Sequence, residues 1–384
     1  MTVLRRHVLF LAGFDPKGAS WYHRIYRTQA QAQARLTGAH YEVSPRRHGE
    51  AGNDCWTVQA GPPGSAAVVH TTIEHLRWDD LVRSQWARNS GAVLRASVAA
   101  YAAMLSAGTA LWRVGRVSPR TLFSLGYPLV FWMLPLLLCI AVWLGWGAVA
   151  GTIALVMALV IASRLERRLN TSWLLQIFAF TQRWAAGRVA GLEDRLKVFG
   201  NRLTQLAADP QIDEVLVVGY SVGSMLAISA VADALARHEH ADHPTTGRPQ
   251  ARLSLVTLGQ CIPLLALLPR AKAFRESLQR VALAPNLTWV DISSPTDWGS
   301  FALVDPVSLC LDLTTAVNPA ALLSPRFHML FEPDTYERLR KDKRRVHLQY
   351  LMAGERAGGY DYFDLTAGAL RLDERDWSAL RPKA

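Results

Sequence analysis

The chain has 384 residues, half of them apolar and only 19% charged, with a formal net charge of +11. Its length allows one large domain or two ordinary ones, and its low charge favours a membrane protein if the apolar residues cluster. The four cysteines form no CxxC pair, which argues against a disulfide framework or a zinc site and indicates a reducing compartment.

The N-terminal part predicts a strand, a helix and further short strands. An apolar run at 8–12 ends at Gly13 and indicates a buried strand, since it is too short for the hydrophobic region of a signal peptide. A helix is expected at 20–36, with Ser20 as its N-cap. Short strands are expected at 41–43, 56–59 and 67–72, and a helix at 73–86.

Residues 121–163 contain no charged side chain. One membrane-spanning helix needs about 20 residues, so this run is too long for one span and suits two. We expect a transmembrane hairpin with arms at about 122–144 and 148–162 and a turn at Gly145-Trp146-Gly147. The alternative is a helical pair buried in a large soluble core.

Arginines stand on both sides of the uncharged run, at positions 113, 116 and 120 before it and 164, 167 and 168 after it. By the positive-inside rule both ends of the hairpin lie in the cytoplasm. This predicts an integral protein of the plasma or inner membrane, with the rest of the chain on the cytoplasmic side. The neighbouring segments 92–112 and 173–206 either lie in the headgroup layer or pack on the protein.

After residue 210 strands alternate with helices. Strands are expected at 215–218, 253–258 and 287–292, and helices at 223–237 and 264–283. This alternation predicts an α/β fold with a mostly parallel sheet covered by helices. If the N-terminal strands join the same sheet, the hairpin is an insertion, and the chain divides into an N-terminal part (1–90), a membrane insertion (91–205) and a C-terminal part (206–384).

A G-x-S-x-G motif, Gly219-Tyr220-Ser221-Val222-Gly223, follows an apolar strand and opens a helix. Such a sharp turn lifts a serine hydroxyl clear of the backbone. The alternative is a glycine-bearing connection with a spectator serine. In this setting the motif resembles the nucleophile elbow of the α/β-hydrolase superfamily, and the resemblance covers about residues 5–80 and 210–365.

The resemblance implies a serine, then an acid, then a histidine along the chain. Asp297 follows the strand at 287–292 and fits the acid position, with Asp291 as second choice; Asp297 could also be an ordinary turn residue. His347 is preferred as the base because its "HLQY" run is similar to that of some membrane-linked relatives. The alternative base is His328, which precedes a helix expected at 334–345, whereas His347 is expected within a strand.

The same resemblance implies two backbone donors for an oxyanion. One is the amide of Val222, directly after the serine, and the other comes from the loop after the first strand, where Gly13 and Phe14 are the candidates.

Two polar tracts have weaker signals. Residues 238–243, HEHADH, could bind a metal ion, but they lack HExxH spacing and suit an exposed loop. Residues 338–345, RLRKDKRR, could contact lipid phosphates or nucleic acid, or form a solvated helix face.

These observations predict a membrane-anchored serine hydrolase that cleaves an ester, a thioester or a lipid-like acyl substrate and needs no cofactor or metal. Its partners are the lipid bilayer and the acyl substrate, and no nucleic acid is expected. The competing hypothesis is a non-catalytic membrane scaffold that uses a hydrolase-like domain to bind a partner.

Overall fold

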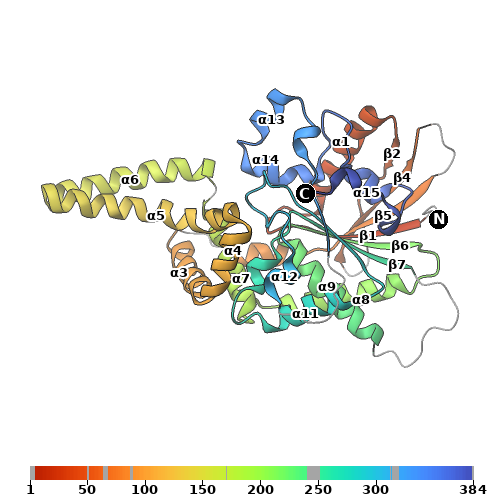
Figure 1. Cartoon of the computed structure of the whole chain (residues 1–384), viewed down its shortest axis with the longest axis horizontal. Helices are drawn as coiled ribbons and strands as arrows, with labels where there is room; N and C mark the ends of the chain where they lie inside the picture. The colour runs from red at the N-terminus through yellow and green to blue at the C-terminus, as the bar shows by residue number, and fades with distance from the viewer. Residues whose placement is uncertain are drawn as a thin grey trace. The chain divides into compact units, whose positions relative to one another are not determined.

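A computed structural model describes residues 5–49, 52–63, 68–86, 90–169, 171–239, 251–311, 313 and 320–382. The chain divides into two compact units (Figure 1). The sheet unit comprises Met1–Ser84, Val189–Ala266 and Ala271–Ala384, and the helical unit comprises Gln85–Arg188 with Leu267–Arg270.

The sheet unit is built on a mixed, mostly parallel sheet with strand order β2-β4-β5-β1-β6-β7-β8-β9, in which β3 also pairs with β4. The strands from β5 to β9 along this order are parallel, whereas β4 runs antiparallel to its neighbours. The strands are β1 Arg5–Leu11, β2 His40–Val43, β3 Arg47–His48, β4 Asp54–Gly61, β5 Val69–His75, β6 Glu214–Tyr220, β7 Arg252–Leu258, β8 Thr288–Ile292 and β9 Ala321–Leu323.

The two halves of the chain meet in the middle of this sheet. β1 pairs with β6, and Val8 lies opposite Leu216. Both strands are buried almost throughout, as expected for parallel strands covered on both faces. The expectation that N-terminal and C-terminal strands share one sheet is therefore confirmed.

Helices cover both faces of the sheet (Figure 1). On one face, Phe10 packs in a cluster with Tyr22 and Tyr26 of α1 and Phe363 of α15. The other face carries α8, α9 and α11. The helices of this unit are α1 Ala19–Thr37, α2 Asp79–Gln85, α8 Leu192–Ala207, α9 Gly223–Glu239, α10 Ile262–Ala266, α11 Lys272–Leu283, α12 Pro306–Cys310, α13 Pro333–Leu339, α14 Lys343–Leu348 and α15 Tyr362–Ala367, with short 3₁₀ turns η2 Phe327–Met329, η3 Gln349–Leu351, η4 Leu372–Glu374 and η5 Ser378–Leu380.

Several predicted boundaries were wrong. Ser20 is not an N-cap, because α1 begins at Ala19 after Gly18. The helix expected at 73–86 starts only at Asp79, since 73–75 continue β5 in register with β1.

Two predicted helices are interrupted. The helix expected at 264–283 is split into α10 and α11 around Pro269, which cannot continue a helix. The helix expected at 334–345 is α13 followed by α14, and the Asp342 side chain caps α14 by accepting a hydrogen bond from the Arg345 amide (3.1 Å). His347 therefore lies in a helix and not in the expected strand.

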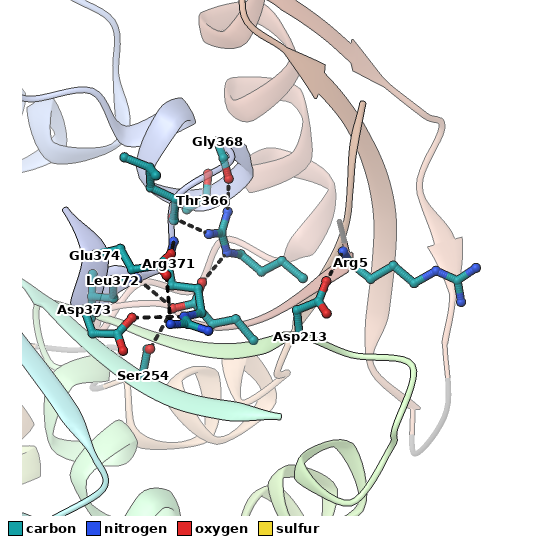
Figure 2. A network of polar contacts seen from close by, with 12 residues as sticks. Arg5, Asp213, Ser254, Thr366, Gly368, Arg371, Leu372, Asp373 and Glu374 are labelled. Carbon is teal, nitrogen blue, oxygen red and sulfur yellow. Dashed lines mark hydrogen bonds and ion pairs between the residues drawn. The ribbon is translucent and has the colours of Figure 1, made fainter. Parts of the chain in front are cut away.

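A buried ion pair between β1 and β6 is hydrogen-bonded to the C-terminal part of the chain, and Figure 2 shows the network of polar contacts in this region. Arg6 Nε lies 2.7 Å from Glu214 Oε2, and both side chains are fully buried. Arg6 also donates to the carbonyls of Gly368 and Leu370, both at 2.7 Å. The other oxygen of Glu214 accepts hydrogen bonds from the Ser254 hydroxyl (2.7 Å) and the Leu372 amide (2.9 Å).

The helical unit contains α3 Ser90–Ser106, α4 Gly108–Val117, α5 Pro119–Trp146, α6 Ala148–Leu169 and α7 Thr171–Ala185. Gly147, with φ +88°, connects α5 to α6. Both helices are long and apolar enough to cross a membrane, and only 6% and 11% of their most apolar windows are buried. The alternative of a helical pair buried in a soluble core is therefore wrong for these residues.

The segment expected at 173–206 forms two helices, α7 and α8, and both pack on the protein. In α7 the side chains of Phe178 and Phe180 are buried, and the Phe178 ring meets the edge of Tyr101 of α3 at 6.1 Å. In α8 a stripe that includes Phe199 and Leu203 is buried within the sheet unit. Of the two alternatives expected for this segment, a position in the headgroup layer or packing on the protein, the structure shows packing for both helices.

Candidate active site

Ser221 occupies the sharp turn between β6 and α9. Its φ of +55° lies in the left-handed region, which costs a residue other than glycine roughly 1–3 kcal/mol. The turn is held by hydrogen bonds: the Ser221 amide donates to the Leu258 carbonyl (2.9 Å), and the Ser221 carbonyl accepts from the amide (3.0 Å) and the hydroxyl (2.6 Å) of Ser224. The surrounding structure thus maintains a strained backbone at this serine.

The two glycines of the motif are required by close backbone contacts. A Cβ at Gly219 would lie 2.7 Å from the Ser224 Cα, and one at Gly223 would lie 2.1 Å from the Leu11 carbonyl oxygen. No side chain fits either gap without movement of the backbone. The motif therefore reflects the packing of β6 and α9 against β1.

The loop after β1 passes directly beside the serine. A Cβ at Gly13 would lie 3.0 Å from the Ser221 Cβ and 3.4 Å from its Oγ. Phe14 follows and is buried, with its ring 6.2 Å from that of Trp78. Val222 directly follows Ser221. The two segments predicted to supply oxyanion donors therefore both adjoin the serine.

His347 and Asp297 form a buried pair. The Nδ1 atom of His347, in α14, lies 2.8 Å from Oδ2 of Asp297, in the loop after β8, and both side chains are nearly inaccessible. Because a carboxylate only accepts hydrogen bonds, Nδ1 carries the proton, and Nε2 is then the basic nitrogen of the ring. The structure thus brings together two of the three residues expected from the sequence.

Further donors fix the Asp297 carboxylate. The Gly299 amide donates to Oδ1 (3.0 Å), and the Tyr350 hydroxyl donates to Oδ2 (3.1 Å). The Gly299 contact is a local turn, so Asp297 is a turn residue as well as a partner of the histidine. The Tyr350 hydroxyl is itself fixed, since it accepts a hydrogen bond from the Ser294 amide (2.8 Å).

The imidazole is also held from the side of the serine turn. Tyr220 donates its hydroxyl hydrogen to the His347 carbonyl (3.0 Å), and its ring lies 5.2 Å from the imidazole. Since Tyr220 directly precedes Ser221, one residue of the motif connects the turn to α14. Sequence reasoning did not assign a role to Tyr220, although it stands inside the motif.

A buried thiol adjoins the serine hydroxyl. Cys261 Sγ lies 3.9 Å from Ser221 Oγ and 3.4 Å from the Gly299 carbonyl oxygen. Burial raises the pKa of Cys261 to about 12, with Asp297 adding to the effect, so the group is a neutral thiol at pH 7. No sequence motif identifies Cys261 as part of the site, because only the tertiary packing of the loop after β7 places it beside Ser221.

The contact between serine and histidine is not formed in this state. Within the described residues, His347 Nε2 accepts no hydrogen bond from Ser221 Oγ. Ser221 is also buried, with 3% of its surface exposed. Hydroxyl attack would therefore need Ser221 to turn from the thiol towards the imidazole, and a substrate would need a path to it.

The second-choice residues lie elsewhere. His328 is exposed in η2, with its ring 6.1 Å from Tyr336. Asp291 lies inside β8 and accepts hydrogen bonds from the hydroxyls of Thr257 (2.6 Å) and Ser293 (2.8 Å). Burial raises the Asp291 pKa to about 7. The histidine that contacts Asp297 is thus His347 and not His328.

The described residues contain no group of three or more His, Cys, Asp or Glu side chains suited to a metal ion. Of the tract at 238–243, residues 240–243 lie outside the described residues.

Comparisons with protein-family models, curated proteins and solved structures find no significant match for this chain. The fold is thus an α/β unit with a mostly parallel sheet, accompanied by a helical unit with two apolar helices. Any statement about function has to be argued from the geometry of the site.

Proposed function

We propose that the protein is a membrane-anchored serine hydrolase of the α/β-hydrolase type, acting on an ester, a thioester or a lipid-like acyl bond. The observation that carries the proposal is the buried His347–Asp297 pair, which lies in the same unit as the strained turn at Ser221. A carboxylate that fixes an imidazole is the arrangement that a general base requires.

In the proposed reaction, Ser221 Oγ attacks the acyl carbon while His347 Nε2 takes the hydroxyl proton. Asp297 stabilises the resulting imidazolium, and the amides of Val222 and Phe14 donate to the oxyanion. The imidazolium then gives its proton to the leaving alkoxide or thiolate, which departs as the bond to the acyl carbon breaks. Water, deprotonated by the same imidazole, releases the acid and restores Ser221.

The resting geometry requires one local movement. Ser221 Oγ must leave the Cys261 thiol and approach Nε2, and we propose that rotation of the Ser221 side chain on substrate binding brings this about. Catalytic hydrogen bonds are often long without substrate and tighten in the complex, so this rotation is compatible with the proposal.

We further propose that α5 and α6 anchor the enzyme as a hairpin with both ends in the cytoplasm. The support is their exposed apolar surface and the arginines that flank the uncharged run on both sides. A membrane anchor suits a substrate that partitions into the bilayer. The sheet unit would then lie on the cytoplasmic side.

The second candidate is a non-catalytic membrane scaffold. It is favoured by one observation, namely that Ser221 is buried beside a thiol and is not hydrogen-bonded to His347. In this case the pair of His347 and Asp297 would only stabilise the loop after β8.

An active-site probe separates the two candidates. The full-length protein in detergent is treated with a fluorescent fluorophosphonate, and labelling is compared in the wild type, Ser221→Ala, His347→Ala and the control His328→Ala. The proposal expects labelling that is abolished by Ser221→Ala, strongly slowed by His347→Ala and unchanged by His328→Ala. Absence of wild-type labelling, together with no turnover of acyl esters of several chain lengths, would favour the scaffold.

A further inference from the structure

The exposed face of α3 is apolar. Val98 and Leu105 are 64% and 68% exposed, and the exposed Ala99 and Ala102 lie between them at helical spacing. From 96 to 112 the sequence contains no charged residue, so this face lacks the charged side chains that a helix normally presents to water. A contiguous apolar surface of this kind marks a site of contact with a membrane or a protein.

The opposite face of α3 is covered by the helical unit. Ala100 and Met104 are buried, and the Tyr101 ring packs on Phe178 of α7. Within this unit, α3, α4 and α7 gather at the end of the α5–α6 hairpin that is opposite its turn (Figure 1). A helix that is apolar all round is normally buried all round, so the exposed face of α3 requires a further apolar covering.

A hydrogen bond fixes the level of α3 along the apolar helix α5. The Tyr101 hydroxyl donates to the Leu125 carbonyl (2.8 Å). At about 1.5 Å per residue, the helix from Leu125 to Gly147 is roughly 33 Å long, and the hydrocarbon core of a bilayer is about 30 Å thick. If the turn reaches the far boundary of this core, Leu125 and α3 lie at the near boundary. Tyr127 agrees with this level, since its hydroxyl donates to the Leu169 carbonyl at the end of α6 (2.8 Å) and tyrosines concentrate at membrane interfaces.

The helix α4 has residue types that suit a headgroup layer. It connects α3 to α5, and only Ser118 separates it from the first residue of α5. Trp112 is 62% exposed, and the Arg116 guanidinium lies 4.5 Å from the centre of its ring. An exposed indole can enter the boundary of the acyl chains while an adjacent arginine meets lipid phosphates. The short connection to α5 keeps this pair near the end of the hairpin.

We propose that these two helices form a lipid-contact surface in the headgroup layer, and we call it the interfacial surface. It consists of Val98, Ala99, Ala102, Leu105, Trp112 and Arg116. A phospholipid bilayer is favoured over a second protein, because α3 is hydrogen-bonded to an exposed apolar helix at the depth of the acyl boundary. Interfacial anchors of this kind set the tilt of a spanning helix. The inference rests on the proposed membrane anchor and does not depend on the proposed hydrolysis.

The test measures the environment of single spin labels on the full-length protein in nanodiscs of phosphatidylcholine and phosphatidylglycerol. The three partly exposed cysteines are replaced by alanine, and the buried Cys261 is kept. Single cysteines are then introduced and labelled one at a time. Collision rates are recorded with oxygen, which concentrates among the acyl chains, and with a nickel chelate, which stays in water.

The expected result is an intermediate depth for α3. The ratio of oxygen to nickel collisions at Val98→Cys and Leu105→Cys should be several-fold higher than at Lys272→Cys, an exposed position of α11, and lower than at Leu137→Cys in α5. These side chains are exposed, so the substitutions should leave the fold intact, which a melting curve checks. In a Val98→Asp/Leu105→Asp background, the ratio at Ala102→Cys should fall towards the Lys272→Cys value, whereas the ratio at Leu137→Cys should be retained.

The possible failures are distinguishable. A ratio at both α3 positions as low as at Lys272→Cys, with a high ratio at Leu137→Cys, would overturn the interfacial surface and leave the anchor standing. Few collisions with either reagent at the α3 positions would show that protein covers this face, which would also overturn the inference. A low ratio at Leu137→Cys as well would overturn the anchor too. Hydrolysis is tested separately by fluorophosphonate labelling of Ser221.

Discussion

The Arg6–Glu214 pair provides a stability prediction that is independent of any proposed activity. Replacing Arg6 with methionine leaves the Glu214 carboxylate fully buried without its cation and deprives the carbonyls of Gly368 and Leu370 of donors. Removing one partner of a buried ion pair costs about 3–5 kcal/mol. This is a large share of the roughly 5–15 kcal/mol that stabilises an ordinary domain.

The cost should be visible as a lower melting temperature. For a unit of this size each kcal/mol lowers the midpoint by about 2–4 °C, so Arg6→Met should melt about 10 °C below the wild type. The assay is thermal unfolding of the full-length protein in detergent, followed by tryptophan fluorescence. The Arg6→Met/Glu214→Leu variant should be more stable than Arg6→Met, because it no longer buries an uncompensated charge.

Two results would refute this reasoning. One is a melting temperature of Arg6→Met within about 2 °C of the wild type, which would mean that the carboxylate is solvated or protonated at little cost. The other is a double variant that loses the sum of the single losses, since this would show that the two charges do not interact. A matched control is Arg356→Gln, whose exposed pair with Glu332 should contribute at most about 1 kcal/mol.

Three further predictions concern the site and its surroundings. Tyr350→Phe removes one of the donors that hold the Asp297 carboxylate in place against His347, so kcat/KM for ester hydrolysis should fall by on the order of 10-fold or more while KM changes little. An unchanged kcat/KM would mean that Tyr350 only packs. Burial raises the Asp291 pKa from 3.8 to about 7, so the contribution of the protonated carboxyl to stability is fully present below about pH 4 and is lost as the pH rises to about 7. Asp291→Asn should therefore flatten the decline of the melting temperature between about pH 4 and 7, and an unchanged decline would contradict the assignment. Since burial raises the Cys261 pKa to about 12, iodoacetamide at pH 8 should leave this thiol unmodified in the folded protein, as read by mass spectrometry of the digested chain, and rapid modification would contradict its burial.

The sequence predicts the serine turn well because the determinants are local. An apolar strand, two glycines and a following helix all stand within a few residues, and the glycine contacts in the structure explain their spacing. The membrane-compatible helices were similarly predictable, since an uncharged run depends on composition alone. Gly147 lies within the expected turn and α6 begins at the expected residue, Ala148, but α5 extends beyond the expected arm at both ends and α6 continues to Leu169, past the expected end at 162.

The partner of Asp297 could not be predicted in this way. His347 and His328 are both separated from it by an irregular part of the chain, and the choice depends on the break between α13 and α14, which orients the second helix. The neighbours Cys261 and Tyr350 are equally non-local. Likewise, the extension of β5 to His75 follows from its pairing with β1, a tertiary effect that overrides local helical preference.

The pairing of β1 with β6 has a consequence for biogenesis. The strand β1 is synthesised before its neighbour β6, which begins only at Glu214, after α3 to α7 of the helical unit have been made. Sheets whose paired strands are far apart in the sequence fold slowly, and strand edges that are still unpaired are prone to aggregation. The N-terminal strands should therefore need a chaperone to shield their unpaired edges until β6 has been synthesised.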